Sequence, residues 1–257
     1  MNQPADQHDD SNRAQVEIFM QVIADDLLML TRLHAKEPDA ELLEVLVNFE
    51  FPKSMGLKLV GDDGDKATQF MSRVIEMLPE SLDDEYLDRL AADFADIYLN
   101  HSLQASPLES VWIDEEKLTC QESMFQVRAW YESYGLKAEN WRIRPDDDLV
   151  LQLQFISHLF SIAESIQELE DIARFMDEHL LRWLGEFAKR VAHRSATPYF
   201  SAVALLTGAY CEELRDLLAT ITNQPRPSAD EIAERMKSRS ESQQVTLSYM
   251  PGLGPAV

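Results

Sequence analysis

The sequence is poor in cysteines and in long apolar runs, and each shortage excludes a class of protein. Its two cysteines, Cys120 and Cys211, form no CxxC pair and no cluster with metal-ligand spacing. Both lie in segments with helical periodicity, so we expect buried thiols in a reducing compartment. No segment reaches the roughly 18 uncharged apolar residues that a membrane-spanning helix needs. The sequence therefore predicts no disulfide framework and no membrane insertion.

Basic residues are also scarce. The 23 Lys and Arg residues stand against 46 Asp and Glu residues, which gives a formal net charge of −23. Such a field repels nucleic acid and anionic lipid and attracts cationic partners, so we predict no nucleic-acid partner. Residues 1–13 are polar and acidic and lack the basic start and apolar run of a signal peptide. We expect these residues to be disordered and the protein to be soluble and cytoplasmic.

Motifs for metal and phosphate chemistry are missing. The sequence has no Glu-x-x-His pair for a di-iron bundle, no HExxH and no GxxxxGK[ST] phosphate loop. Asp84 and Asp88 would share a helix face, as Mg²⁺-binding acids of some all-α enzymes do, but no second acidic motif completes that site. We predict no catalytic residue, metal or cofactor, and keep a metal-dependent all-α enzyme using this pair as a remote alternative.

Helical periodicity runs through most of the chain, with no convincing strand and no repeat, which predicts an all-α protein. Gly135 is a candidate left-handed cap, and Thr197-Pro198 supplies an N-cap and a first-turn proline. Residues 101–114 read as irregular. The expected helices cover residues 16–33, 42–49, 70–78, 83–98, 115–134, 149–162, 199–214 and, without a break, 172–191.

The stretch from Arg144 to Leu149 separates two groups of helices. Pro145 cannot sit inside a helix, and the three acids after it offer capping oxygens and favourable charge at a helix start. The following segment, 149–162, is apolar on more than one side, as expected for a central core helix. We predict a bundle in two packed halves, 14–142 and 149–222, joined by a hinge at 143–148. The simpler alternative is a solvated acidic N-cap with no further role.

Residues 223–257 contain four prolines and read as a mostly disordered extension. One short helix is expected, opened by the capping box Ser228-x-x-Glu231. As an alternative to disorder, four apolar residues could fold back into a binding groove as an internal placeholder: Leu247, Tyr249, Met250 and Leu253.

Four segments, taken together, resemble the TorD/DmsD family of cytoplasmic chaperones for molybdoenzymes exported by the twin-arginine route. They are Ile23–Leu30 with Glu37-Pro38-Asp39; Asp93-Phe94 with Tyr98 and the loop Ser106–Trp112; the junction, which is similar to the signature Glu-Pro-Asp-Asp-His; and Phe175–Val191 with His179 and Trp183. Their order and spacing are family-like from about Val16 to Thr222. Arg144 and Asp148 depart from the signature's Glu and His, and Leu108 replaces a frequent aromatic residue.

The resemblance implies a two-part, TorD-like helical fold that forms monomers or domain-swapped dimers. It implies a non-enzymatic chaperone that holds the apo form and the twin-arginine signal peptide of a molybdenum oxidoreductase until the cofactor is inserted. The implied client is a formate dehydrogenase, or a sulfoxide or N-oxide reductase. An acidic rim would steer the basic part of such a peptide, and an apolar groove would hold the rest. The expected client-binding residues are Tyr98, Pro107, Leu108, Trp112, Pro145, Asp146, Asp147 and Asp148, with His179 and Trp183 structural.

Two alternatives accompany this hypothesis. Tyr98 and Trp112 could equally be ordinary core aromatics, because aromatics at helical spacing usually are. The chaperone could also serve a client that is not exported, without reading a signal peptide.

Overall fold

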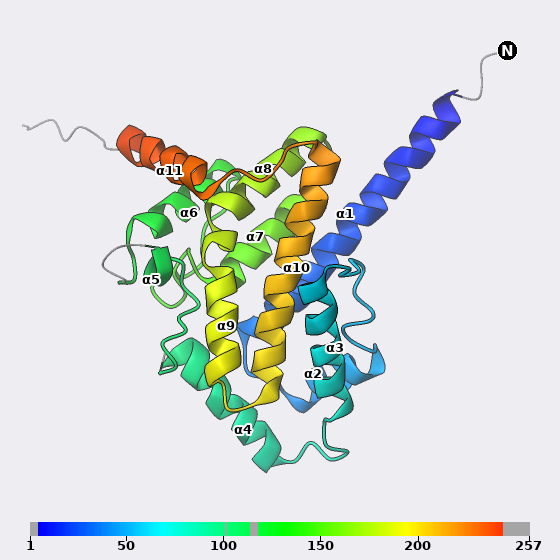
Figure 1. Cartoon of the computed structure of the whole chain (residues 1–257), viewed down its shortest axis with the longest axis vertical. Helices are drawn as coiled ribbons and strands as arrows, with labels where there is room; N and C mark the ends of the chain where they lie inside the picture. Colours follow the sequence, from blue (N-terminus) through cyan, green and yellow to red (C-terminus); the bar gives the residue numbers. More distant parts are fainter. Residues whose placement is uncertain (1–4, 101, 114–117, 244–257) are drawn as a thin grey trace, which may run out of the picture. The chain divides into compact units, whose positions relative to one another are not determined.

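The computed structural model describes residues 5–100, 102–113 and 118–243, and this part of the chain contains helices but no β-strand (Figure 1). The all-α prediction is confirmed. A π-helical turn, Ala95–Leu99, extends α4, and a 3-10 turn, Leu180–Arg182, follows α8. The α-helices are α1 Ala5–Ala35, α2 Ala40–Asn48, α3 Asp62–Glu76, α4 Asp84–Phe94, α5 Ser110–Ile113, α6 Glu122–Ser133, α7 Leu149–Ile162, α8 Ile166–Glu178, α9 Leu184–Arg194, α10 Pro198–Thr222 and α11 Ala229–Gln243.

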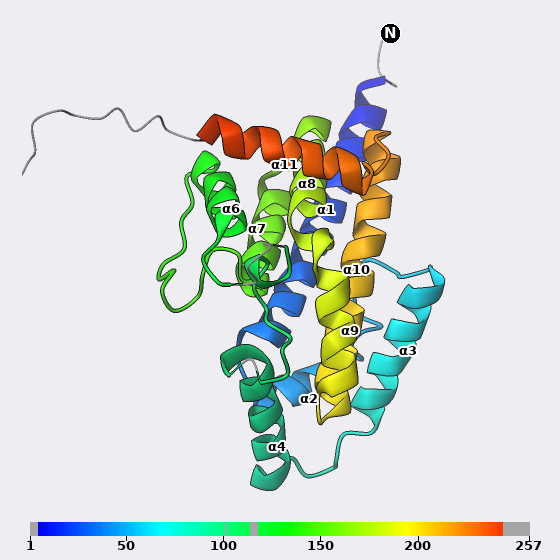
Figure 2. The same cartoon turned by 60° about the vertical axis from the view of Figure 1, so that its left-hand side comes forward.

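Helices α7 and α10 form the middle of the bundle. Helix α1 packs along α7, and α10 packs against α3, α8 and α9 (Figures 1 and 2). Both views place α2 and α4 at the end of the bundle away from α6. Helix α7 buries apolar side chains on more than one of its sides, including Leu149, Phe155 and Phe160, as the sequence predicts for a central helix.

Contacts between residues divide the chain into two compact units, one ending at Arg226 and the next beginning at Pro227. The junction 143–148 lies inside the first unit. Helix α1, from before the junction, packs on α7, from after it, so the two predicted halves share one core. The hinge at 143–148 stays a prediction.

Several predicted helix ends are confirmed. The Asp148 carboxylate caps α7 by accepting a hydrogen bond of 2.8 Å from the Val150 amide. The structure shows a further carboxylate cap at α4, where Asp83 accepts from the Tyr86 amide over 2.9 Å. Gly135 has a φ of 71°, the left-handed geometry expected after α6. These signals are local, so they can be read without knowing the fold.

The predicted continuous helix 172–191 is wrong. Helix α8 ends at Glu178, and His179, with φ −124° and ψ −82°, turns the chain into the 3-10 turn before α9 begins at Leu184. Apolar residues on both sides of this turn face the same core, so their spacing does not reveal the break. The His179 side chain is fully buried and bound to a distant loop, which accounts for the local geometry.

Two helix starts also differ from the prediction. Helix α1 begins at Ala5 and not at residue 16, because a helical backbone can continue without an apolar stripe. Helix α6 begins at Glu122 and not at residue 115; residues 118–121 are not helical, and Cys120 has a φ of 60°. Its thiol is exposed, whereas Cys211 is buried as predicted.

In the second unit, α11 is the predicted short helix. Its capping box is present, with the Ser228 amide donating to the Glu231 carboxylate over 2.7 Å and the Glu231 amide donating to the Ser228 hydroxyl over 3.3 Å. The four apolar residues proposed as a placeholder, Leu247, Tyr249, Met250 and Leu253, lie outside the described residues. In the part of the chain that the structure describes, no helix is long and apolar enough to cross a membrane.

Candidate functional site

The loop before α5 and the junction before α7 lie side by side, although about 40 residues separate them in the sequence. Leu108 and Asp148 form an isolated antiparallel bridge. The Leu149 amide donates to the Pro107 carbonyl over 2.8 Å, and the Glu109 amide donates to the Asp147 carbonyl over 3.2 Å. We call residues 105–112 and 145–149 the loop–junction site. It contains seven of the eight predicted binding residues, and only Tyr98 lies outside it.

The three junction carboxylates point into the protein and bind its own groups. Asp146 is 2% exposed and forms an ion pair of 2.8 Å with Arg128. Asp147 is fully buried and accepts a hydrogen bond of 2.9 Å from the Ser110 amide. Asp148, 8% exposed, caps α7. In this arrangement the acids fasten the loop and α6 to the start of α7, and none of them faces an incoming peptide.

Glu109 is the centre of the site, although sequence reasoning did not single it out. Its carboxylate is fully buried, with Oε1 2.9 Å from His179 Nδ1 and Oε2 2.8 Å from the amide nitrogen of Gln152. The same Gln152 amide group donates to the Asp147 carbonyl over 3.2 Å. One carboxylate thereby joins the loop, α7 and the turn after α8. The only sequence signal for this role is that Glu109 lies inside the family-like loop motif.

Burial sets the electrostatics of the junction. Desolvation raises the pKa of Asp147, and its hydrogen bond from the Ser110 amide opposes that rise. Desolvation also raises the pKa of Asp148 to about 6, against the opposing effect of the Arg144 guanidinium. The pKa of the buried Tyr131 hydroxyl is raised well above its usual value, first by desolvation and then by the nearby Asp146. Burial thus disfavours the charged forms of Asp147, Asp148 and Tyr131.

The predicted groove aromatics occupy two different places. Trp112 is half-buried in the loop–junction site. Its indole N–H donates to the Ser106 carbonyl over 2.8 Å, and the Arg190 guanidinium lies 4.3 Å from the centre of its ring. Tyr98 is half-buried in a cluster with Phe94 and Phe200, and its hydroxyl lies 2.6 Å from His34 Nδ1. Of these two aromatic residues, Trp112 belongs to the loop–junction site and Tyr98 does not.

The structural residues predicted in the second half lie in the core. His179 is 0% exposed and Trp183 is 1% exposed. The His179 ring packs 5.2 Å from the Phe175 ring, and the Trp183 ring packs 5.7 Å from the Phe187 ring. Both residues thus link the turn between α8 and α9 to the surrounding aromatics.

Among residues 5–100, 102–113 and 118–243, no group of three or more His, Cys, Asp or Glu side chains could hold a metal ion. The pair Asp84 and Asp88, both exposed at the start of α4, has no such third partner there. The geometry therefore gives the metal-enzyme alternative no support in the described residues.

One family model and several known chaperones match this chain. A family model described as nitrate reductase delta subunit matches residues 64–189, which include the loop, the junction and α8. A chaperone protein TorD from Vibrio cholerae serotype O1 is 32% identical over 159 residues, covering 56% of this chain and 71% of the relative. A chaperone protein TorD from Shewanella loihica is 27% identical over 226 residues, covering 83% of this chain and 99% of the relative.

Proposed function

Because the chain belongs to the TorD family of molybdoenzyme-maturation chaperones, we propose that it binds the apo form and the twin-arginine signal peptide of one molybdenum-containing oxidoreductase. It holds both in the cytoplasm while the cofactor is inserted, before export. The observation that carries this proposal is the match to chaperones named TorD, which extends over almost the whole length of one relative.

The charge of the chain supports a cationic ligand. A twin-arginine signal peptide is basic at its start and apolar in its middle, and a protein with a net charge of −23 attracts such a segment from a distance. The client is an oxidoreductase of formate dehydrogenase type or of sulfoxide or N-oxide reductase type, as the family resemblance implies.

Within the loop–junction site, the half-buried groups are the ones that a client can reach. We assign contact with the client to the exposed sides of Trp112 and Pro145 in this site, and to the exposed side of Tyr98 outside it. Asp146, Asp147 and Asp148, with Pro107 and Leu108, act as positioning residues, because their side chains are buried among the chain's own partners. Their work is to hold the loop that presents Trp112.

Calorimetric titration of the purified protein tests this function. The titrants are the signal peptide of a molybdoenzyme encoded beside this gene, the same peptide with both arginines replaced by glutamine, and the apo enzyme without its leader. We expect micromolar binding of the native peptide and of the apo enzyme, and clear weakening for the glutamine peptide. Failure to bind either the peptide or the apo enzyme would refute the proposal.

The loop–junction assignment needs its own variant. Trp112→Leu removes the half-buried indole, and Trp141→Leu removes a second partly exposed indole, 40% exposed, in the loop after α6. We expect Trp112→Leu to weaken client binding about ten-fold, in line with the ~1–2 kcal/mol typical of an aromatic contact residue, and Trp141→Leu to leave it unchanged. Equal effects of the two changes would remove Trp112 from the contact surface.

A client that is not exported is the second candidate function. It predicts binding of the apo enzyme without its leader and no binding of the isolated signal peptide. The titrations above separate it from the first.

A further inference from the structure

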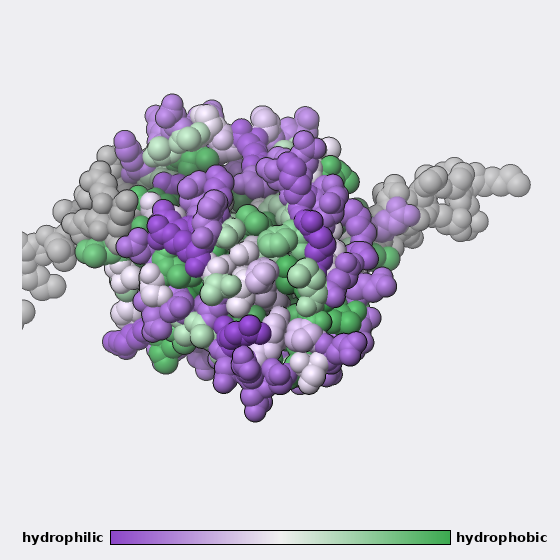
Figure 3. All heavy atoms as spheres, turned by 60° about the horizontal axis from the view of Figure 1, so that its bottom comes forward, coloured by the Kyte–Doolittle hydropathy of each residue, from purple (hydrophilic) through white to green (hydrophobic). Residues whose placement is uncertain are grey.

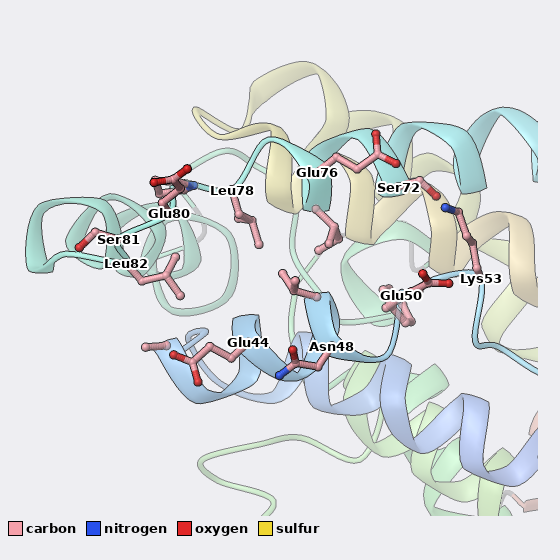
Figure 4. Close-up of a pocket in the computed structure, with 15 residues that line it drawn as sticks. Glu44, Asn48, Glu50, Lys53, Ser72, Glu76, Leu78, Glu80, Ser81 and Leu82 are labelled. Carbon is pink, nitrogen blue, oxygen red and sulfur yellow. The ribbon is translucent and has the colours of Figure 1, made fainter.

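A hollow far from the loop–junction site lies between α2 and the end of α3. It has a volume of about 780 Å³ and is closed at one end by the segment 78–82 (Figure 4). Ligand pockets in proteins occupy about 300–1,000 Å³, so this hollow has room for a few side chains of a partner. In Figure 4, Glu44 and Asn48 come from α2, and Leu78 points from the end of α3 toward α2. We call this hollow the α2–α3 slot.

Apolar and polar side chains together line the α2–α3 slot. Five aliphatic or aromatic side chains line it: Val47, Phe51, Ile75, Leu78 and Leu82. Val47 is 48% exposed, and two further large apolar side chains nearby in the sequence are more exposed, Phe49 at 67% and Met77 at 79%. Figure 3, which looks onto this end of the bundle, shows apolar residues gathered between hydrophilic ones. Among the residues that line the slot, Val47 thus offers an exposed apolar contact, and Leu78 and Leu82 are half-buried.

The edge of the slot is acidic. Four glutamates line it, Glu44, Glu50, Glu76 and Glu80, against one basic residue, Lys53. None of the four carboxylates forms a hydrogen bond or an ion pair with another side chain in the described part of the chain. The junction acids, by contrast, are buried and bound to partners such as Arg128. A cation from outside can therefore reach the slot glutamates, unlike the junction acids.

We propose that the α2–α3 slot binds a peptide segment in which basic side chains stand next to a short apolar run. The apolar run packs on Val47, Leu78 and Leu82, and the guanidinium or ammonium groups pair with Glu44 and Glu80. This assignment rests on the proposed function, in which the segment is the signal peptide of the client. It assigns cation binding, which the sequence alone predicts for the junction acids, to the exposed glutamates of the slot.

Titration with the native signal peptide tests the slot, using two variants with matched controls. Glu44→Gln/Glu80→Gln removes two edge charges, and Glu132→Gln/Glu139→Gln makes the same change in net charge at exposed positions in and after α6. Val47→Ser removes one apolar contact, and Val16→Ser makes the same change in α1 at a side chain with the same 48% exposure. The side chains of all four glutamates and both valines are exposed, so we expect these variants to fold.

We expect the edge variant to weaken peptide binding about five-fold and to flatten its salt dependence, because two exposed ion pairs are lost. We expect Val47→Ser to weaken it about three-fold through lost apolar contact. Both control variants should bind the native peptide with the affinity of the unaltered protein. The peptide with both arginines replaced by glutamine should bind the edge variant and the unaltered protein equally.

The outcomes separate the slot from the proposed function. Peptide binding that is the same in the slot variants and in their controls overturns the slot and leaves the function standing. Absence of peptide binding to the unaltered protein also overturns the slot, and binding of the leaderless apo enzyme then decides whether the function falls with it. Light scattering that shows a dimer dissociated by the slot variants would assign the slot to a second copy of the chain.

Discussion

Asp148 occupies a position where this chain departs from the family signature that it resembles. The family signature has a histidine there, whereas this chain has an acid that caps α7 through the Val150 amide. The same carboxylate is almost completely buried, and burial raises its pKa to about 6. Asp148 thus improves the helix start through its hydrogen bond and weakens the fold through its charge. The balance between the two depends on pH.

Replacing Asp148 by Asn tests this balance. The folded pKa of about 6 lies above the ordinary value of 3.8, so the folded state binds more protons than the unfolded state between those values. Stability from this group is therefore gained as pH falls through 6 and is absent above it. Asn keeps the cap and carries no charge, so Asp148→Asn should be more stable than the unaltered protein at pH 8 by about 1–3 kcal/mol.

Urea unfolding at pH 8 and pH 5 measures the difference, which should shrink at the lower pH. Asp88→Asn, at an exposed position in α4, is the control and should show no such dependence. A variant whose advantage is the same at both pH values would contradict the assigned titration.

At the scale of elements, α8 and α10 are joined by a buried ion pair. The Arg215 guanidinium donates to both Asp177 oxygens, over 2.8 and 2.7 Å, and both side chains are more than 90% buried. A buried pair of this kind adds little net stability compared with apolar residues, but an unpaired member is costly. It therefore fixes how the two helices face each other.

Arg215→Met should destabilise the protein by about 3–5 kcal/mol, because it leaves the Asp177 charge buried without a partner. The double change Arg215→Met/Asp177→Leu should recover most of that loss. Thermal or urea unfolding of the three proteins measures the coupling. Lys189→Met breaks an exposed pair with Glu186 and should change stability by less than about 1 kcal/mol. Additive losses in the double variant would argue against a coupled pair.

At the scale of the whole molecule, the first compact unit contains its own core. That core includes side chains from α1, α7 and α10, all before Arg226. A chain ending at Arg226 should unfold in one cooperative transition and bind the signal peptide with an affinity within about two-fold of the full chain. Calorimetry on the truncated chain measures both. Loss of the cooperative transition, or tighter peptide binding, would show that residues after Arg226 contribute to the fold or compete for the site.

Net charge is the other property of the whole chain. Because −23 charges act together over distances comparable with the screening length, they should speed association with a basic peptide. Stopped-flow measurements should show an association rate that falls at least ten-fold between about 50 and 500 mM salt, with a smaller change in dissociation rate. The leaderless apo enzyme, if its surface is not basic, is the comparison. A rate independent of salt would exclude electrostatic steering.

The sequence by itself determined the features that depend on neighbours along the chain. Helical periodicity predicted the all-α class. Apolar residues on more than one side of 149–162 predicted a central helix, and local capping chemistry predicted the helix ends at Gly135, Asp148 and Ser228. The ordered motifs predicted the family. Each of these signals is complete within a few turns of helix, which is why no tertiary contact was needed to read it.

The tertiary structure alone decided which acids are available. Asp147 is buried because it binds Ser110, 37 residues away, and Glu109 is central because it binds His179, 70 residues away. The α2–α3 slot likewise exists because two helices and the segment 78–82 meet around apolar residues. From the sequence alone, a run of acids is compatible with a solvated cap or with a binding rim. Its distant partners decide between the two, because burial is a property of the packed chain and not of the local sequence.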